Sequence, residues 1–102
     1  MRRGSTPTHT FTLTLDADMI AKVRVLYSQD GEFLFRKEGD QVNIDGQKVT
    51  VELTQEDTLR FKEGVAEVQL RVNTHGEKSI PSNIYTIPVS RLLEDEVFPY
   101  DE

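Results

Sequence analysis

The sequence predicts an all-β fold, an antiparallel immunoglobulin-like β-sandwich of six or seven strands with one short helical turn near residues 55–61. Short segments of alternating apolar and polar residues recur at intervals of about ten residues. Two Asp-Gly pairs stand between such segments, where hairpin turns need residues that accept positive φ. A capped helical turn leads into the segment with the strictest alternation. A small barrel is the alternative arrangement.

The centre of the fold is expected to be the stretch LTQEDTLRFKEGVAEVQLRV. Thr54 and Asp57 have the spacing of a capping box, in which each side chain bonds the backbone of the other residue and begins a short helix. Leu59 and Phe61 are expected to hold this turn against the core. The strand that follows has an apolar face and a polar face, because its pattern has a period of two. The core-facing residues are Ala66, Val68, Leu70 and Val72, and the others are Val65, Glu67, Gln69 and Arg71.

The segment THTFTLTL, residues 8–15, predicts the first strand, because apolar residues alternate there with β-branched threonines. Residues 16–20 then form a connection with one helical turn, for which Asp16 supplies the cap. Met19 and Ile20 are expected to face the core.

A β-hairpin is expected next, with strands over residues 22–29 and 32–37. Asp30 and Gly31 lie between these strands, and both central positions of a type I′ turn need positive φ. In the returning strand, Phe33 and Phe35 are expected on one face and Leu34 on the other. This part of the hairpin is therefore expected to be covered on both sides.

The remaining strands are expected over residues 42–44, 49–53 and 80–89. Asp45 and Gly46 supply the turn between the first two of them. Pro81 and Pro88 lack the N–H group that a ladder hydrogen bond needs, so the last strand is expected at a sheet edge.

Three parts follow from this assignment: an N-terminal arm over residues 1–7, a β-sandwich domain over residues 8–90 and an acidic-hydrophobic C-terminal tail over residues 91–102. The tail contains five acidic residues and one arginine, so it carries −4 of the net charge of −6.

The composition limits the classes of function. The acidic balance argues against a protein that binds nucleic acid through its phosphates, since such proteins need clustered lysine and arginine. The chain has no cysteine, and this excludes disulfides, thiolate metal sites and cysteine nucleophiles. It has no apolar run of signal-peptide or membrane-spanning length. We therefore expect no membrane partner, and we expect synthesis in a cytoplasm.

No enzymatic activity, cofactor or metal ion is expected. His9 and His75 have no second ligand at metal spacing, and they are interpreted as solvated side chains. Asp16 and Asp18 lack the further oxygen ligands and the glycine of a calcium loop, so capping and turn formation explain them better. Other candidates lack the correct residue order, an activating base or a pocket that shifts a pKa. These are GEKS at residues 76–79, the threonines at residues 6–14, and the carboxylates of Glu56, Asp57 and residues 94–96.

The candidate binding site is a surface, and the tail is its main part. Large apolar residues stand among the acids of the tail, whereas disordered acidic ends usually lack them. We expect apolar anchors to enter a groove on a neighbouring subunit, with the acids attracted to a basic rim that the arm of another copy helps to form. The alternative is that the tail folds back on its own domain. The candidate partner-binding residues are Arg2, Arg3, Leu92, Leu93, Glu94, Asp95, Glu96 and Phe98.

Three stretches carry a resemblance to known proteins: RRGSTPTHTFTL, LTQEDTLRFKEG and VQLRV. They resemble small uncharacterised proteins of Firmicutes phages and prophages that lie among virion structural genes, and the resemblance spans Arg2 to about Leu93. A second, weaker similarity is to the β-sandwich N-terminal domain of phage baseplate upper proteins. The resemblance implies a virion or tail-associated interaction module without catalytic residues. Because the chain stops after one domain, an adaptor or accessory role is expected.

Two functions remain as hypotheses. In the first, the protein is a phage virion or tail-associated structural or assembly protein that binds other phage structural proteins or itself, as a homo-oligomer, through sheet edges and terminal arms. In the second, it is a small acidic phage-encoded inhibitor that occupies a basic groove of a host defence protein. The first is favoured, and it places the protein in the virion after assembly in the bacterial host cytoplasm.

Overall fold

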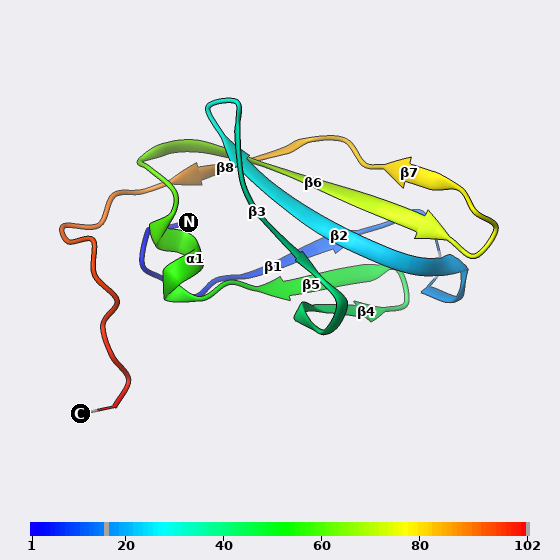
Figure 1. Cartoon of the computed structure of the whole chain (residues 1–102), viewed down its shortest axis with the longest axis horizontal. Helices are drawn as coiled ribbons and strands as arrows, with labels where there is room; N and C mark the ends of the chain where they lie inside the picture. Colours follow the sequence, from blue (N-terminus) through cyan, green and yellow to red (C-terminus); the bar gives the residue numbers. More distant parts are fainter. Residues whose placement is uncertain (16, 102) are drawn as a thin grey trace.

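The computed structural model describes residues 1–15 and 17–101, and two antiparallel sheets pack face to face in it (Figure 1). One sheet has the order β1-β5-β4, and the other has the order β3-β2-β6, with β7 and β8 both paired to the side of β6 that faces away from β2. The strands are β1 (Thr8–Thr12), β2 (Ile20–Gln29), β3 (Glu32–Glu38), β4 (Val42–Asp45), β5 (Lys48–Glu52), β6 (Gly64–Thr74), β7 (Ser79–Pro81) and β8 (Tyr85–Val89). The helical segments are α1 (Gln55–Leu59) and the 3-10 turns Ala17–Met19 and Gly39–Gln41.

This strand order is that of an immunoglobulin-type sandwich, which confirms the predicted fold class. β1, β5 and β4 take the places of strands B, E and D, and β3, β2 and β6 take those of C′, C and F. β7 and β8 together take the place of strand G. The chain crosses between the sheets from β1 to β2, from β3 to β4 and from β5 to β6, and α1 lies in the last of these connections (Figure 1).

The described residues contain eight strands, one more than the upper number predicted, because the last predicted strand breaks in two at Ser82. The Ser82 N–H donates to the Leu70 carbonyl (2.8 Å), but the Leu70 N–H donates to the Ser82 hydroxyl (2.9 Å). A side-chain oxygen thus replaces a backbone carbonyl in the ladder. Pro81 lies in β7 and Pro88 in β8, at a sheet edge as predicted.

The core lies between the two sheets, and the paired strands β2 and β6 supply much of it. The alternation predicted for residues 65–72 is confirmed, because the four apolar side chains are buried while Arg71 is exposed and Glu67 and Gln69 are half-buried. The buried hydrophobic residues are Ile20, Val23, Val25, Tyr27, Phe35, Val49, Val51, Leu53, Phe61, Ala66, Val68, Leu70, Val72 and Val89.

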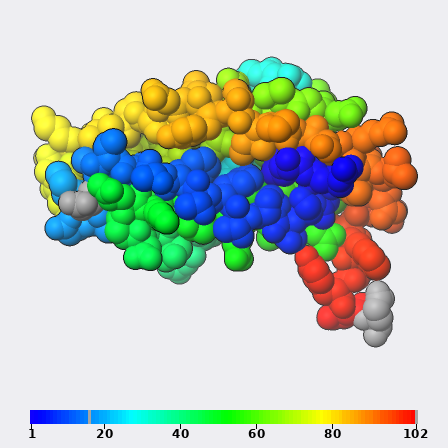
Figure 2. All heavy atoms as spheres, turned by 180° about the vertical axis from the view of Figure 1, so that it is seen from behind, coloured from blue at the N-terminus to red at the C-terminus, as the bar shows by residue number. Residues whose placement is uncertain are grey.

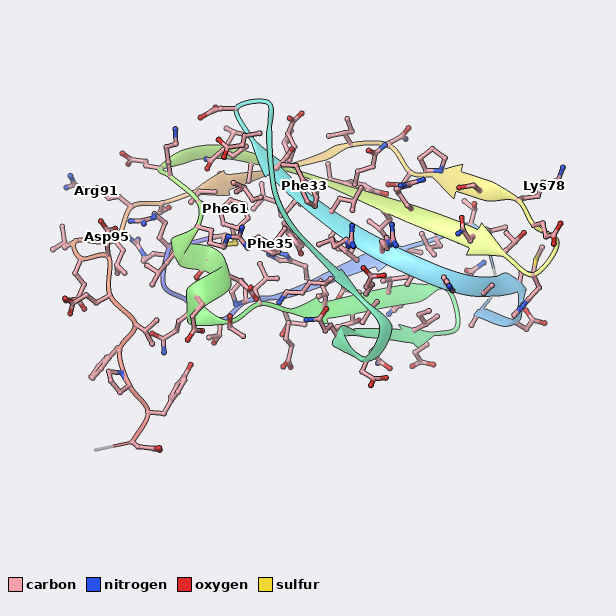
Figure 3. The ribbon with its side chains drawn as sticks, viewed as in Figure 1. Phe33, Phe35, Phe61, Lys78, Arg91 and Asp95 are labelled. Atoms are coloured by element: carbon pink, nitrogen blue, oxygen red, sulfur yellow. The ribbon has the colours of Figure 1, made fainter. Side chains whose placement is uncertain are left out.

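An aromatic cluster fills the core beside α1 (Figure 3). The ring of Tyr27 stacks on that of Phe35 with centroids 4.9 Å apart, and the ring of Phe61 lies edge-on to both, at 6.0 Å and 5.6 Å. Aromatic pairs at such distances contribute roughly 0.5–1.5 kcal/mol each beyond the area they bury.

The predicted capping box begins α1. The Asp57 N–H donates to Thr54 Oγ1 (3.1 Å), and the Thr54 N–H donates to Asp57 Oδ2 (2.9 Å). The same carboxylate forms an ion pair with Lys37 of β3 (2.7 Å), and both side chains are more than four-fifths buried. Burial alone raises the pKa of Asp57, but the hydrogen bonds from Lys37 and Thr54 outweigh it and lower this pKa.

Two predicted side-chain orientations are wrong. Phe33 and Phe35 do not share a face, because the register of β3 on β2 shifts so that Phe33 is opposite Ser28 while Phe35 is opposite Tyr27. Leu34 is the extra residue of this β-bulge, and its carbonyl accepts a hydrogen bond from Arg60. Met19 is 49% exposed instead of buried, whereas Ile20 lies in the core. The predicted cap Asp16 lies outside the described residues.

The two hairpin turns differ from each other. Asp30 and Gly31 have φ values of 54° and 79° between the paired Gln29 and Glu32, as a type I′ turn requires. In the second hairpin, Asp45 pairs with Lys48, so the central residues are Gly46 and Gln47, one position later than predicted.

Replacing Leu70 tests the register of β6. Leu70→Ala should lower the free energy of unfolding by about 2–5 kcal/mol, because it removes a fully buried side chain and leaves a cavity. Arg71→Ala, on the opposite face of the same strand, should change it by less than about 0.5 kcal/mol. Denaturant unfolding measures both variants, and equally small effects would contradict the register.

The Asp57–Lys37 pair should make the domain less stable in acid. Because folding lowers the pKa of Asp57, its contribution is present at neutral pH and is lost as the pH falls through the folded pKa, below about pH 4. In Asp57→Asn, the unfolding free energy should therefore decline less steeply than in wild type between about pH 5 and about pH 2. Asp45→Asn, at an exposed hairpin position, is the control and should keep the wild-type slope. Parallel slopes for wild type and Asp57→Asn would refute the assignment.

Candidate functional site

The N-terminal arm and the C-terminal tail both contact α1 at one end of the sandwich (Figure 1). The arm runs along the end of β8, where the Arg3 N–H donates to the Ser90 carbonyl (3.0 Å) and the Ser90 N–H donates to the Met1 carbonyl (2.7 Å). Arg2 and Ser90 form a parallel bridge. The first residues of the arm are therefore part of the sheet edge, next to the start of the tail.

Arg3 holds the arm, α1 and the tail together. Its guanidinium donates to the carbonyls of Leu59 (3.0 Å) and Phe61, at the end of α1 where helical carbonyls lack partners. It also forms an ion pair with Asp95, with an N–O distance of 2.7 Å. The Arg3 side chain is 16% exposed and that of Asp95 is 80% exposed, so the arginine is committed to its own chain while the carboxylate faces solvent.

A glycine brings the tail close to the arm. Gly4 has a φ of 79°, and a Cβ at this position would lie 2.6 Å from Leu92 Cδ2. Both the backbone conformation and the lack of space favour glycine here. Leu92 is half-buried on this glycine, so it packs within its own chain.

Gln55 holds the tail further along. Its side-chain amide donates to the Phe98 carbonyl (3.0 Å), and its Oε1 accepts from the Phe98 N–H (2.8 Å). Gln55 is 8% exposed, so a nearly buried amide fixes one residue of the tail through its backbone alone.

The side chains of the same segment face solvent. Leu93 is 91% exposed, Phe98 71% and Tyr100 80%, and the last part of the tail projects from the body (Figure 2, red). Backbone and ion-pair contacts hold the tail in place, while its large apolar groups remain free for contact with another molecule.

The structure therefore divides the predicted binding residues into two groups. Arg2, Arg3, Leu92 and Asp95 lie in the junction between arm and tail; Arg2 donates to the Arg91 carbonyl (2.8 Å). Leu93, Glu94, Glu96 and the side chain of Phe98 are exposed and make none of the hydrogen bonds or ion pairs found in the described residues. Because Arg3 is occupied within its own chain, a basic rim for a partner has to come from elsewhere.

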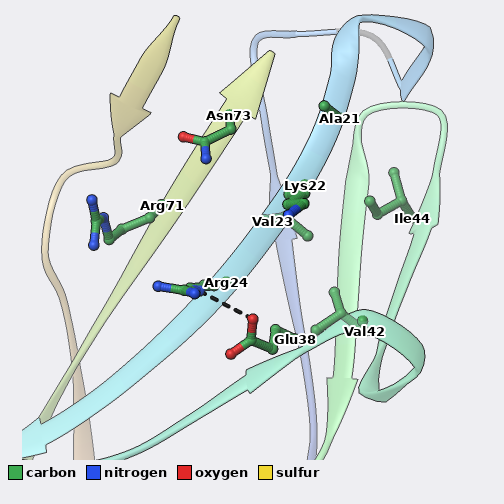
Figure 4. Close-up of a pocket in the computed structure, with 10 residues that line it drawn as sticks. Ala21, Lys22, Val23, Arg24, Glu38, Val42, Ile44, Arg71 and Asn73 are labelled. Atoms are coloured by element: carbon green, nitrogen blue, oxygen red, sulfur yellow. Dashed lines mark hydrogen bonds and ion pairs between the residues drawn. The ribbon is translucent and has the colours of Figure 1, made fainter. Parts of the chain in front are cut away.

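A second surface lies on the outer face of the five-stranded sheet. The predicted polar face of Glu67, Gln69 and Arg71 is part of it, whereas the basic residues of β2 that lie beside Arg71 are not predicted from the sequence. Arg24 of β2 and Arg71 of β6 are direct cross-strand partners, and Lys22 lies next to them. All three line a cavity of about 410 Å³ that reaches across the edge of the sheet to Val42 and Ile44 of β4 (Figure 4). Arg24 Nε donates to Glu38 (3.1 Å), and this hydrogen bond lowers the pKa of the Glu38 carboxyl. Arg71 takes part in none of the ion pairs within the described residues.

The other end of this face is apolar. Phe33, turned outward by the β-bulge, lines a cavity of about 170 Å³ together with Leu26 and Ile84. Phe33 and Ile84 are each 56% exposed. The alternation of β2 could have placed its basic residues on the solvent face, but their pairing with Arg71 depends on a register that the sequence alone does not give.

The histidines do not form a metal site. His9 Nδ1 lies 2.8 Å from the Tyr27 hydroxyl, and burial lowers the pKa of His9, so its interpretation as a solvated side chain is wrong. His75 is exposed as predicted. Residues 1–15 and 17–101 hold no group of three or more histidines or carboxylates arranged to bind a metal ion. Asp18 is exposed, and its predicted neighbour Asp16 is outside the described residues.

No protein-family model, curated protein or solved structure matches this chain. Its described part contains no helix with the length and apolar character that crossing a bilayer requires.

Removing the Gln55 side chain should release the end of the tail. In Gln55→Ala, the amide proton of Phe98 should exchange roughly fivefold faster, because a hydrogen bond worth about 1 kcal/mol is lost. Glu56→Ala, at an exposed position of the same helix, is the control and should leave this exchange rate unchanged. Hydrogen exchange followed by NMR gives both rates. Equal Phe98 rates in wild type and Gln55→Ala would show that the bond does not hold the tail.

Proposed function

We propose that this protein is a protein–protein interaction module, a structural or assembly component of a phage virion or its tail. The observation that carries the proposal is the tail, whose backbone is fixed by Gln55 while the side chains of Leu93, Phe98 and Tyr100 face solvent. Large aromatic groups on a positioned segment are typical anchors of protein interfaces. Ordering the tail before it binds also lowers the entropy cost of association. The resemblance to phage structural-cluster proteins supports the virion as the setting.

A free sheet edge gives further support. Among the described residues, β1 pairs only with β5, because the arm that could have covered it pairs with β8 instead. In the antiparallel register, the backbone N–H and C=O groups of His9 and Phe11 point toward β5. The backbone groups of Thr8, Thr10 and Thr12 therefore point away from the sheet. Such an edge can accept an extended segment of a partner.

The test is incorporation into particles. Virions of the encoding phage or induced prophage should contain the polypeptide, and the double variant Phe98→Ser/Tyr100→Ser should be depleted from them at least tenfold, taking each aromatic anchor at about 1–2 kcal/mol. This variant keeps the backbone bonds to Gln55, so its melting temperature should stay near that of wild type.

The control is Met19→Ser, which removes an exposed apolar side chain from the 3-10 turn before β2 and should be incorporated normally. Quantitative mass spectrometry of purified particles measures all three proteins. Absence of wild type from virions, together with tail-dependent binding to a host protein, would overturn the proposal in favour of an inhibitor.

A further inference from the structure

We propose that the tail of one copy docks along the outer face of the five-stranded sheet of a second copy. Its acids would lie on the basic end formed by Lys22, Arg24 and Arg71, and its aromatic residues would lie on the apolar end formed by Leu26, Phe33 and Ile84. We call these six residues the docking face. The inference rests on the proposed interaction function and names the partner as a second copy of this chain.

Charge complementarity favours an acidic occupant at the basic end. Like charges directly opposite each other on a sheet are destabilising, and Arg24 and Arg71 are such a pair. Glu38 compensates Arg24, whereas Arg71 is exposed and has no ion pair in the described part of the chain. These cations gather on one face of a protein whose net charge is −6. The tail carries most of that negative charge, so each copy offers both halves of the contact.

The apolar end has room for an aromatic ring. Its cavity of about 170 Å³ compares with the 150 Å³ or so of an engineered cavity that binds benzene. Glu67 and Gln69 also line it and offer polar partners to a tyrosine hydroxyl. Phe98 and Tyr100 are the exposed aromatic side chains of the tail.

The spacing of the two surfaces agrees. Arg24 marks the basic end of β2, and Ser28, the cross-strand partner of Phe33, marks the apolar end four residues later. At about 3.3 Å per residue the two ends are about 13 Å apart. Glu96 and Tyr100 are also four residues apart, so the tail would span both ends together once the bend at Glu96 straightens on the docking face.

The attachment of the tail to its own copy decides which acids are available. Asp95 is occupied by Arg3, whereas Glu94 and Glu96 are exposed and make none of the ion pairs in the described residues. Glu94 and Glu96 are therefore the residues that would approach Arg71. The second copy binds a segment that Gln55 and Arg3 of the first copy already hold in place.

A charge exchange tests the inference on the full-length protein. Sedimentation velocity at low salt should show concentration-dependent self-association of wild type, weakened at least tenfold in Arg71→Glu and in Glu94→Lys/Glu96→Lys. Mixing these two variants should restore association, because the reversed tail then meets the reversed face and the native tail meets the native face. Higher salt should weaken wild-type association, since the charges are exposed.

Two further variants separate the docking face from general effects. Lys48→Glu makes the same charge change at an exposed position of β5 in the other sheet and should leave association unchanged. Phe33→Ser should weaken association at least tenfold without lowering the melting temperature, because its side chain is largely exposed.

Equal losses in Arg71→Glu and Lys48→Glu, or no recovery on mixing, would overturn the docking face. Wild type that stays monomeric at about 1 mM would exclude a second copy as the partner. If tail-dependent incorporation into virions persisted in that case, the proposed function would stand and only this inference would fail.

Discussion

The antiparallel pairing of β2 with β6 determines both the core and the exposed face of the larger sheet. In this register Val25 is opposite Leu70, and both are fully buried. The neighbouring pair, Arg24 and Arg71, must then face solvent together, since successive side chains of a strand point to opposite faces. A slip of β6 by one residue would turn its apolar side chains to solvent and place Arg71 in the core. The energy of core burial thus holds two like charges side by side on the surface.

The two sheets are held together without a disulfide, because the chain has no cysteine. Antibody domains join strands B and F by a disulfide that packs on a tryptophan of strand C. Here Tyr27, in the strand that corresponds to C, stacks on Phe35 and approaches Phe61. Its hydroxyl bonds His9 of the opposite sheet. An aromatic cluster with one hydrogen bond across the interface therefore occupies the region that a disulfide holds in antibody domains.

Local patterns made much of this fold predictable, and long-range contacts account for what was missed. The capping box of Thr54 and Asp57 and the turn at Asp30 and Gly31 follow from residues close together in the chain. The β-bulge that turns Phe33 outward does not follow from such local patterns, because the Leu34 carbonyl accepts a hydrogen bond from Arg60, far along the sequence. The sequence predicts the tail as a binding segment but does not predict its attachment to Gln55, because this bond joins residues 43 positions apart. Partner and setting remain predictions, since no pattern within the chain specifies a second molecule.

The placement of the tyrosines makes different parts of the protein optically distinguishable. The chain has three tyrosines and no tryptophan, so tyrosine dominates its near-ultraviolet signals. Tyr27 is fully buried, and burial, together with the charge of Asp57, raises the pKa of its hydroxyl. Tyr100 is 80% exposed at the end of the tail. Circular dichroism of the rigid Tyr27 ring therefore reports on the core. Because Tyr85 is also 39% exposed, quenching of tyrosine fluorescence by a soluble agent reports on the tail alone in a Tyr85→Phe background.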